Sequence, residues 1–250
     1  VKLYPGAPCV LKDTGPGIDF VIIRENLEGL FASFGGGSKV GDEVATDTLV
    51  VTRKGTSQVS DFAFRLAQRR NGRTRDGKKM VTCVDKANVF QSMAFFRKVF
   101  FDVAENYPDI DADAVYVDAM SLYMVQNPWD FDVLVMENQF GDILSDLGAG
   151  LVGGLGFAPG VNIGKDVAIF EAVHGSAPDI AGKGIANPSA LLLAVCLMLE
   201  HMGLNETAGR IRAALKTVIE EGETVTSDLG GSAGTRAFGD AVIEEIQAGA

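Results

Sequence analysis

The sequence predicts an α/β fold, because short apolar segments alternate with segments of helical periodicity. Four of the apolar segments are rich in β-branched residues and are typical of strands: 20–23, 80–84, 114–117 and 133–136. The alternation favours parallel pairing in at least part of the sheet. Each segment is followed by charged or amide residues: Arg24-Glu25-Asn26, Asp85-Lys86, Asp118 and Glu137-Asn138. Ligands of open α/β sheets bind at the carboxyl ends of strands, so these are candidate site residues.

Three segments have the periodicity of amphipathic helices. The first covers 88–103 and places Val89, Met93, Phe96, Phe100 and Val103 on one face. Phe90, Phe95 and Phe101 lie off that face, which indicates a second covered surface such as a dimer interface. The other two helices are predicted around Ala208, Ile211, Leu215 and Ile219, and from Thr235 with Phe238, Val242 and Ile246 inward.

Composition excludes several classes of protein. The 250 residues are 47% hydrophobic and 22% charged, which is ordinary for a globular chain with a core. A formal net charge of -11 argues against a nucleic-acid partner, and the basic stretch 69–79 contains turn signals typical of a solvated loop. The longest apolar run, 190–199, is too short to cross a bilayer. Cys9, Cys83 and Cys196 do not have the spacing of metal ligands, which favours a reducing compartment. We therefore expect a cytoplasmic protein.

Asp142 and Asp146 stand four residues apart and would share one face of a helix. Two carboxylates so placed repel each other unless a cation lies between them, and Mg²⁺ or Mn²⁺ accepts such hard oxygen ligands. The alternative is that Asp142 caps the helix while Asp146 is solvated.

The segment 172–188 is rich in small residues and precedes an apolar helix. We expect Asn187 to cap that helix and Pro188 to occupy its first position, so that the loop ends where anions are stabilised. Glycines 175, 182 and 184 would let the backbone approach a ligand, and Asp179 would meet ribose hydroxyls. The alternative is an ordinary Gly/Pro loop. The G-x-G-x-x-G match at 148–153 follows a helix rather than a strand, so we interpret it as close helix packing.

Five motifs in order resemble the isocitrate/isopropylmalate dehydrogenase family of β-decarboxylating dehydrogenases. They are 21–26 (VIIREN), 84–89 (VDKANV), 117–120 (VDAM), 138–146 (NQFGDILSD) and 174–188. The resemblance covers essentially the whole chain, and it implies that a further N-terminal portion, with two substrate-binding arginines and a specificity helix, precedes Val1.

This resemblance implies an isopropylmalate-dehydrogenase-like two-domain fold with mixed sheets flanked by helices. Residues 1–152 would form the smaller domain, which dimerises and carries substrate and metal groups. Residues 153–250 would form the C-terminal part of the larger NAD-binding domain, which is incomplete in this chain.

The resemblance implies a role for each residue at a matching motif position. Arg24 would bind a substrate carboxylate, and Lys86 would be the catalytic base. The ligands of Mg²⁺ or Mn²⁺ would be Asp118, Asp142 and Asp146. Catalytic Lys86 and Asp118 would serve the partner subunit's active site, which implies a homodimer or higher homo-oligomer with shared sites. The lysine works as a base only if burial and a nearby cation lower its pKa. Besides the second subunit, we expect the protein to bind a small hydroxy acid as its substrate. We expect it to bind neither nucleic acid nor a membrane.

The resemblance also names a cofactor set: Glu171, His174, Gly175, Ser176, Ala177, Asp179, Ile180, Asn187 and Asp228. NAD is favoured over NADP, because an anionic Asp179 accepts bonds from ribose hydroxyls and repels a 2′-phosphate. His201, in the following helix, is interpreted as a core imidazole with its hydrogen bonds satisfied.

The implied reaction is NAD-dependent oxidative decarboxylation of a 3-substituted malate to a 2-keto acid and CO₂. The segment Arg24-Glu25-Asn26 with Glu28-Gly29 resembles the isocitrate, homoisocitrate and tartrate branches, so an isocitrate-like substrate is favoured and 3-isopropylmalate comes next. Phe31 departs from the family, which usually carries a catalytic tyrosine at this position. The alternatives are a non-catalytic or regulatory subunit, or a module that binds metal or nucleotide without turnover.

Overall fold

The computed structural model describes residues 1–249, which divide into two compact units. Unit 1 consists of Val1–Lys2 and Asp13–Gly148, and unit 2 consists of Leu3–Lys12 and the residues from Ala149 onward. The segment Leu3–Lys12, which the sequence analysis places in the first domain, is therefore grouped with the second unit.

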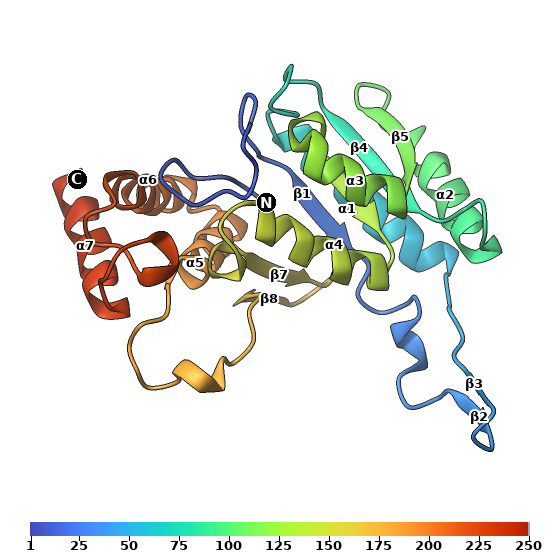
Figure 1. Ribbon diagram of the computed structural model, residues 1–250. Helices are drawn as coiled ribbons and strands as arrows, with labels where there is room; N and C mark the ends of the chain where they lie inside the picture. The colour runs from blue at the N-terminus through green and yellow to red at the C-terminus, as the bar shows by residue number, and fades with distance from the viewer. Residues whose placement is uncertain (250) are drawn as a thin grey trace. The chain divides into compact units, whose positions relative to one another are not determined.

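Strands and helices alternate through unit 1 (Figure 1). Its elements are β1 (Val21–Arg24), β2 (Ser38–Val40), β3 (Val44–Thr46), α1 (Arg53–Arg69), β4 (Met80–Asp85), α2 (Gln91–Ala104), β5 (Asp111–Tyr116), α3 (Val117–Gln126), β6 (Val133–Met136) and most of α4 (Asn138–Leu151). Unit 2 contains β7 (Pro159–Ile163), β8 (Ala168–Ala172), α5 (Ser189–His201), α6 (Asn205–Glu221) and α7 (Thr235–Ala248).

The centre of unit 1 is a four-stranded parallel sheet in the order β1-β6-β4-β5. All four predicted strands and the predicted parallel pairing are confirmed. The largest change of bounds is at β5, which begins at Asp111, and Val117 opens α3 instead of ending the strand. Asp118 therefore lies in the first turn of a helix.

Helices cover both faces of this sheet. Alternate residues of β4 and β6, among them Val81, Cys83 and Val135, share a buried cluster with Phe64 of α1 and with Phe96 and Phe100 of α2. On the other face, Gly148 of α4 lies against Met124 of α3 and Ile22 of β1. Strands that are buried from both sides read as continuous apolar runs, as the sequence of β6 does.

The predicted packing face of α2 is confirmed for Met93, Phe96 and Phe100, which are buried. Val89 lies before the helix and is exposed, so the predicted start at residue 88 is too early. Phe90 and Phe101, which lie off the packing face, are also exposed within this single chain.

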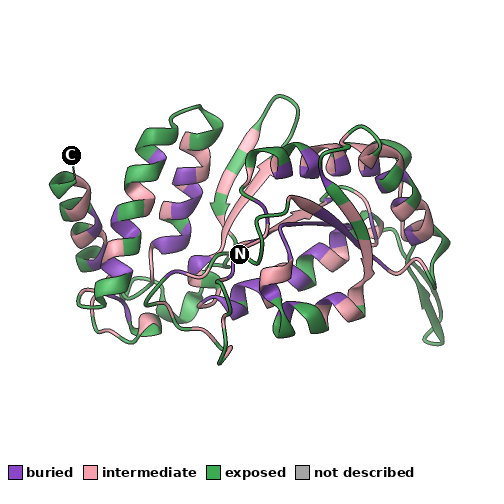
Figure 2. Cartoon of the chain, turned by 90° about the horizontal axis from the view of Figure 1, so that it is seen from above, coloured by how far each residue is buried: buried purple, intermediate pink, exposed green. Residues whose placement is uncertain are grey.

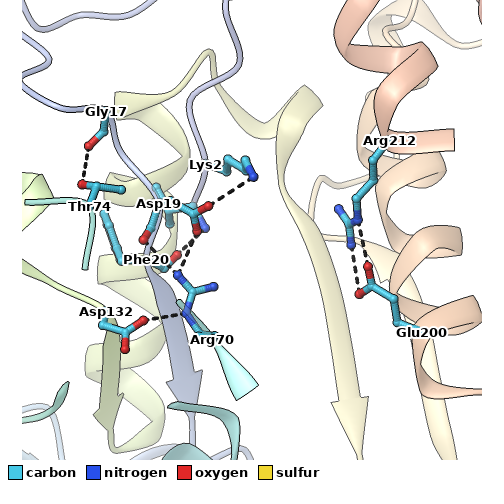
Figure 3. Close-up of polar contacts among 10 residues, drawn as sticks. Lys2, Gly17, Asp19, Phe20, Arg70, Thr74, Asp132, Glu200 and Arg212 are labelled. Carbon is cyan, nitrogen blue, oxygen red and sulfur yellow. Dashed lines mark hydrogen bonds and ion pairs between the residues drawn. The ribbon is translucent and has the colours of Figure 1, made fainter. Parts of the chain in front are cut away.

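Of the basic stretch 69–79, Arg69 ends α1 and residues 70–79 connect α1 to β4, which confirms its interpretation as a loop. Arg70 bonds both Asp19 and the fully buried carboxylate of Asp132, as Figure 3 shows. Arg73 pairs with Asp76, and Arg75 pairs with Asp130.

In unit 2, helices α5, α6 and α7 share a buried core, and the antiparallel hairpin β7–β8 lies against α5. The purple buried faces of these helices in Figure 2 are formed by residues such as Leu193, Leu215, Phe238 and Val242. This confirms the inward faces predicted for α6 and α7. Gly6 has a φ of +83°, and a side chain there would collide with the carbonyl of Ile219, so only glycine allows the segment Leu3–Lys12 to lie on α6.

The G-x-G-x-x-G match at 148–153 lies at the C-terminal end of α4, which confirms that it is no strand-to-helix fingerprint. Across residues 1–249, we find no helix that combines the length and the apolar character needed to span a bilayer.

Candidate functional site

The carboxyl ends of the four parallel strands bring the predicted polar residues of unit 1 to one edge of the sheet. Arg24 is the last residue of β1, and Lys86 directly follows β4. Asn138 opens α4 two residues after the end of β6, and Asp118 lies in the first turn of α3 after β5. Because β6 lies between β1 and β4, the groups that follow β1 and β6 are direct neighbours.

Arg24 is held by two side chains of α4. Its Nε donates to Oδ1 of Asn138 at 2.9 Å, and one terminal nitrogen pairs with Oδ1 of Asp142 at 2.7 Å. Gly141 makes this possible, since a side chain there would collide with the arginine side chain. The guanidinium carbon also lies 5.7 Å from the ring centroid of Phe31. The side chain keeps 30% of its surface exposed, so a carboxylate ligand can reach it.

Two buried carboxylates shape the backbone beside Arg24. Glu25 accepts hydrogen bonds from the amides of Leu27 and Glu28, and Glu137 accepts from the first amides of α4. Burial raises the pKa of Glu137, while those amide donors act in the opposite direction. Gly29 has a φ of +80° and lies against Glu137, where a side chain would collide with the carboxylate. These groups fix the loop that follows β1.

Lys86 and Asp118 form an ion pair with Nζ and Oδ1 at 2.5 Å. Hydrogen bonding to Lys86 lowers the pKa of Asp118. The lysine side chain is 24% exposed and the aspartate 68% exposed, so both reach the surface of unit 1. The lysine Nζ also lies 5.8 Å from the ring centroid of Tyr116, a residue that the sequence analysis does not single out.

The predicted metal carboxylates are only partly brought together. Asp142 and Asp146 are exposed and lie one turn apart on α4, so the predicted common face is confirmed, and the capping role considered for Asp142 is wrong because the helix begins at Asn138. Asp118 is instead paired with Lys86. Within residues 1–249, no group of three His, Cys, Asp or Glu side chains is arranged to hold a metal ion. Two hard carboxylate donors still fit Mg²⁺ or Mn²⁺, which often take one or two from a protein.

In unit 2, the segment 172–188 leaves β8 as a long exposed loop and returns at the start of α5 (Figure 1). All residues from 173 to 186 are exposed. Gly182 and Gly184 have positive φ, as does Ala177 at +43°, which opens a short 3-10 turn at Pro178–Ile180. Within the described part of the chain, the carboxylate of Asp179 has no hydrogen-bond or ion-pair partner, so it is free to accept bonds.

The end of this loop is tied to the rest of unit 2. Asn187 lies one position before Pro188, which is the N-cap residue of α5 in place of Asn187. The Asn187 side chain accepts from the amide of Ser189 at 2.9 Å and donates to Oδ2 of Asp228 at 2.8 Å. Pro188 is the residue before α5 rather than its first residue. The amide of Thr235, at the start of α7, bonds the carbonyl of Gly184.

The other predicted cofactor residues lie along the same segment. Glu171, at the end of β8, accepts from Asn162 of β7 at 2.8 Å. His174 is exposed, and its Nδ1 lies 3.0 Å from the carbonyl of Gly175. His201 is exposed and its ring centroid lies 5.6 Å from the Phe170 ring centroid, so its interpretation as a core imidazole is wrong. An exposed backbone with two glycines, a free carboxylate and a helix N-terminus together fit a nucleotide ligand.

Comparison with known proteins places the chain among dehydrogenases. A sequence profile described as isocitrate/isopropylmalate dehydrogenase matches residues 1–242. The 3-isopropylmalate/3-methylmalate dehydrogenase of Methanocaldococcus jannaschii is 46% identical over 99% of this chain and 72% of its own length. The isocitrate dehydrogenase [NAD] subunit alpha, mitochondrial, of Macaca fascicularis is 45% identical over 96% of this chain and 69% of its own length.

Solved structures agree with these relatives. The crystal structure of isocitrate dehydrogenase from Methylococcus capsulatus superposes with a TM-score of 0.88 at 44% identity, over 98% of this chain and 71% of that one. The crystal structure of the TT0538 protein from Thermus thermophilus gives a TM-score of 0.89 at 41% identity, over 98% of this chain and 48% of that one. The predicted two-domain α/β fold is thereby confirmed, and the chain spans part of each of these proteins.

Proposed function

Because the chain belongs to the isocitrate/isopropylmalate dehydrogenase family, we propose that it oxidises and decarboxylates a 3-substituted malate, with NAD as hydride acceptor and Mg²⁺ or Mn²⁺ as cofactor. One observation carries the proposal: Arg24, Lys86 and the carboxylates of Asp118 and Asp142 all follow the carboxyl ends of one parallel sheet. Two such sheet edges, one from each subunit of the dimer proposed below, would together supply an anion-binding group, a proton-transfer group and cation ligands.

Each side chain has a chemical task in this reaction. Arg24 binds a carboxylate of the hydroxy acid and orients it, since its planar guanidinium matches two carboxylate oxygens. Lys86 takes the proton from the substrate hydroxyl oxygen while the adjacent C–H bond breaks, and later supplies a proton to the oxygen of the enol. In the described chain, Asp118 accepts a hydrogen bond from the ammonium group of Lys86.

Asp118, Asp142 and Asp146 would hold the divalent cation. The nicotinamide of NAD supplies a hydride acceptor, and the cation supplies a Lewis acid that stabilises enolate charge. Residues 171–187 and Asp228 would bind the adenosine half of NAD, with Asp179 at the ribose hydroxyls.

We propose a dimer in which Lys86 and Asp118 of one subunit complete the site around Arg24, Asp142 and Asp146 of the other. This is supported by the finding that no three His, Cys, Asp or Glu side chains within residues 1–249 are grouped to hold a metal ion, while Asp118 pairs with Lys86 and Asp142 pairs with Arg24. Three cysteines without disulfides among the described residues support a reducing compartment, and we propose the cytosol.

For the substrate, we propose an isocitrate-like malate first and 3-isopropylmalate next. The segment Arg24-Glu25-Asn26 supports an isocitrate-like substrate. The sequence identities to a relative named for 3-isopropylmalate and to one named for isocitrate are nearly equal, so the test includes both substrates.

The test uses the natural protein at full length, with isocitrate, homoisocitrate, 3-isopropylmalate and tartrate compared under Mg²⁺ and Mn²⁺. We expect NADH formation and CO₂ release with one of them, and loss of both on chelation by EDTA. Absence of turnover with every substrate in the presence of metal would contradict the proposal.

A non-catalytic subunit is the second candidate, and Phe31 is the observation that favours it. This ring lies beside Arg24, at a position where the family resemblance implies a tyrosine hydroxyl that protonates the enol carbon. A catalytic protein should gain decarboxylated product per NADH when Phe31→Tyr restores the hydroxyl, whereas a non-catalytic subunit should bind NAD and Mn²⁺ with no turnover in either form.

A further inference from the structure

Asp85, the last residue of β4, is fully buried, and its carboxylate accepts two hydrogen bonds from the guanidinium group of Arg97. Arg97 of α2 donates through Nε to Oδ2 at 2.6 Å and through a terminal nitrogen to Oδ1 at 2.8 Å. A two-point pair of this kind fixes the carboxylate in direction as well as in place. A buried carboxylate without its partner would be strongly unfavourable, so the pair has one stable geometry.

The same carboxylate fixes the backbone on the far side of Lys86. Oδ1 of Asp85 also accepts the amide of Ala87 at 2.8 Å. Lys86 is therefore the middle residue of a short turn that is closed by the Asp85 side chain, and the direction of its Cα–Cβ bond follows from the orientation of that carboxylate.

Tyr116 links the other end of the lysine to the same arginine. The guanidinium carbon of Arg97 lies 4.9 Å from the Tyr116 ring centroid, and Nζ of Lys86 lies 5.8 Å from it. A cation stacked on an aromatic ring limits where that ring can turn, and the ring in turn borders the path of the lysine side chain. Both the backbone and the amine end of Lys86 thus depend on Arg97.

We propose that Arg97 is a positioning residue that fixes the direction of the Lys86 ammonium group, through the carboxylate of Asp85 and the ring of Tyr116. The consequence for turnover rests on the proposed function, in which Lys86 transfers a proton. The positioning of Lys86 does not rest on the proposed function, because all of these contacts lie within the chain.

The test replaces Arg97 and follows Lys86 directly. In Arg97→Ala, we expect Lys86 to be reductively methylated faster than in the wild type, with Lys39 in the exposed β2–β3 hairpin as the internal reference in the mass spectrum. We expect kcat to fall about 10- to 100-fold, as for a misplaced catalytic group, with KM for the hydroxy acid unchanged. Guanidinium ion at low concentration should restore part of kcat, and sodium chloride at equal ionic strength should not.

Arg73→Ala is the matched control, because Arg73 makes the same two-point pair with Asp76 in the loop before β4. It should leave both the labelling of Lys86 and kcat unchanged. If Arg97→Ala does not fold, Arg97→Lys keeps the charge but loses the fork, and the same two measurements apply.

Unchanged labelling of Lys86 in a folded Arg97 variant would overturn the proposal, whatever the activity. Faster labelling supports it even if no substrate is turned over, in which case the proposed function fails separately. A fall in kcat that guanidinium does not restore, with unchanged labelling, assigns Arg97 a merely structural role and also overturns it.

Discussion

Arg24 and Asp142 are ion-paired at 2.7 Å across the gap between the end of β1 and the second turn of α4. In the proposed site, each of these groups has another partner: a substrate carboxylate for the arginine and a divalent cation for the aspartate. The two groups are 30% and 53% exposed, and pairs of this kind contribute about 0 to 1 kcal/mol. Exchanging them for ligands therefore costs little.

Asp142→Asn is expected to weaken Mn²⁺ binding by at least about 10-fold, since it removes one anionic oxygen donor. The measurement is free Mn²⁺ by electron paramagnetic resonance, without substrate. Asp109→Asn, at an exposed site after α2, is the control and should bind as the wild type does. Equal affinity of Asp142→Asn and the control would remove Asp142 from the metal site.

Lys86→Gln is expected to lower kcat by about 10²- to 10⁴-fold, the usual contribution of a proton-transfer group, with a small change in KM. Steady-state kinetics with the preferred hydroxy acid measures both constants. Lys39→Gln, on the exposed β2–β3 hairpin, should have no effect. A raised KM with unchanged kcat would make Lys86 a binding residue instead.

Asp179→Lys is expected to shift the cofactor preference from NAD toward NADP. The carboxylate would no longer repel a 2′-phosphate, and the ammonium group would attract it. We expect the ratio of kcat/KM for the two cofactors to change by at least about 10-fold, or ~1.4 kcal/mol. Asp166→Lys, in the exposed turn between β7 and β8, makes the same charge change and should leave the ratio as it is.

Arg70→Ala is expected to lower the free energy of unfolding by about 3 to 5 kcal/mol, because it leaves the fully buried carboxylate of Asp132 without its cationic partner. Urea unfolding followed by circular dichroism measures the change. Arg236→Ala removes an arginine that is 95% exposed and should change stability by less than about 1 kcal/mol. Similar losses in the two variants would show that the buried pair is energetically unimportant.

The Arg70 effect should also depend on pH. Burial would raise the pKa of Asp19, but hydrogen bonding and charge from Arg70 hold it below the ordinary value. A carboxyl with a lowered pKa stabilises the fold above its unfolded pKa and loses that contribution as the pH falls through its folded pKa. The difference between wild type and Arg70→Ala should therefore be constant near neutrality and shrink below about pH 4. Unfolding curves at several pH values test this.

The elements of the sheet are predictable from the sequence because each strand is a local apolar run, as at 80–84 and 133–136. The order β1-β6-β4-β5 is not, since it depends on which edges pair after the chain collapses. That order decides which groups meet. Asn138 contacts Arg24 only because β6 lies beside β1, and the spacing of the two residues along the chain contains no sign of it.

The motifs around Lys86 and Asp142 identify residues that would touch ligands, but not those that hold them. Arg97 lies on α2, and the apolar periodicity of this helix predicts only which residues are buried. It does not predict that the guanidinium group of Arg97 pairs with Asp85. The hydrogen bond from the Ser189 amide to the Asn187 side chain is different, because it joins residues two positions apart and local chemistry suffices to predict it.

The β2–β3 hairpin projects from unit 1 with all six of its strand residues exposed (Figure 1). An isolated two-stranded ribbon is only marginally stable in water, and such segments open locally long before the core does. In the single chain, its backbone amides should exchange with solvent deuterium much faster than those of the central parallel sheet. The turn at Gly41, between its strands, should be the first site in unit 1 that a protease cuts.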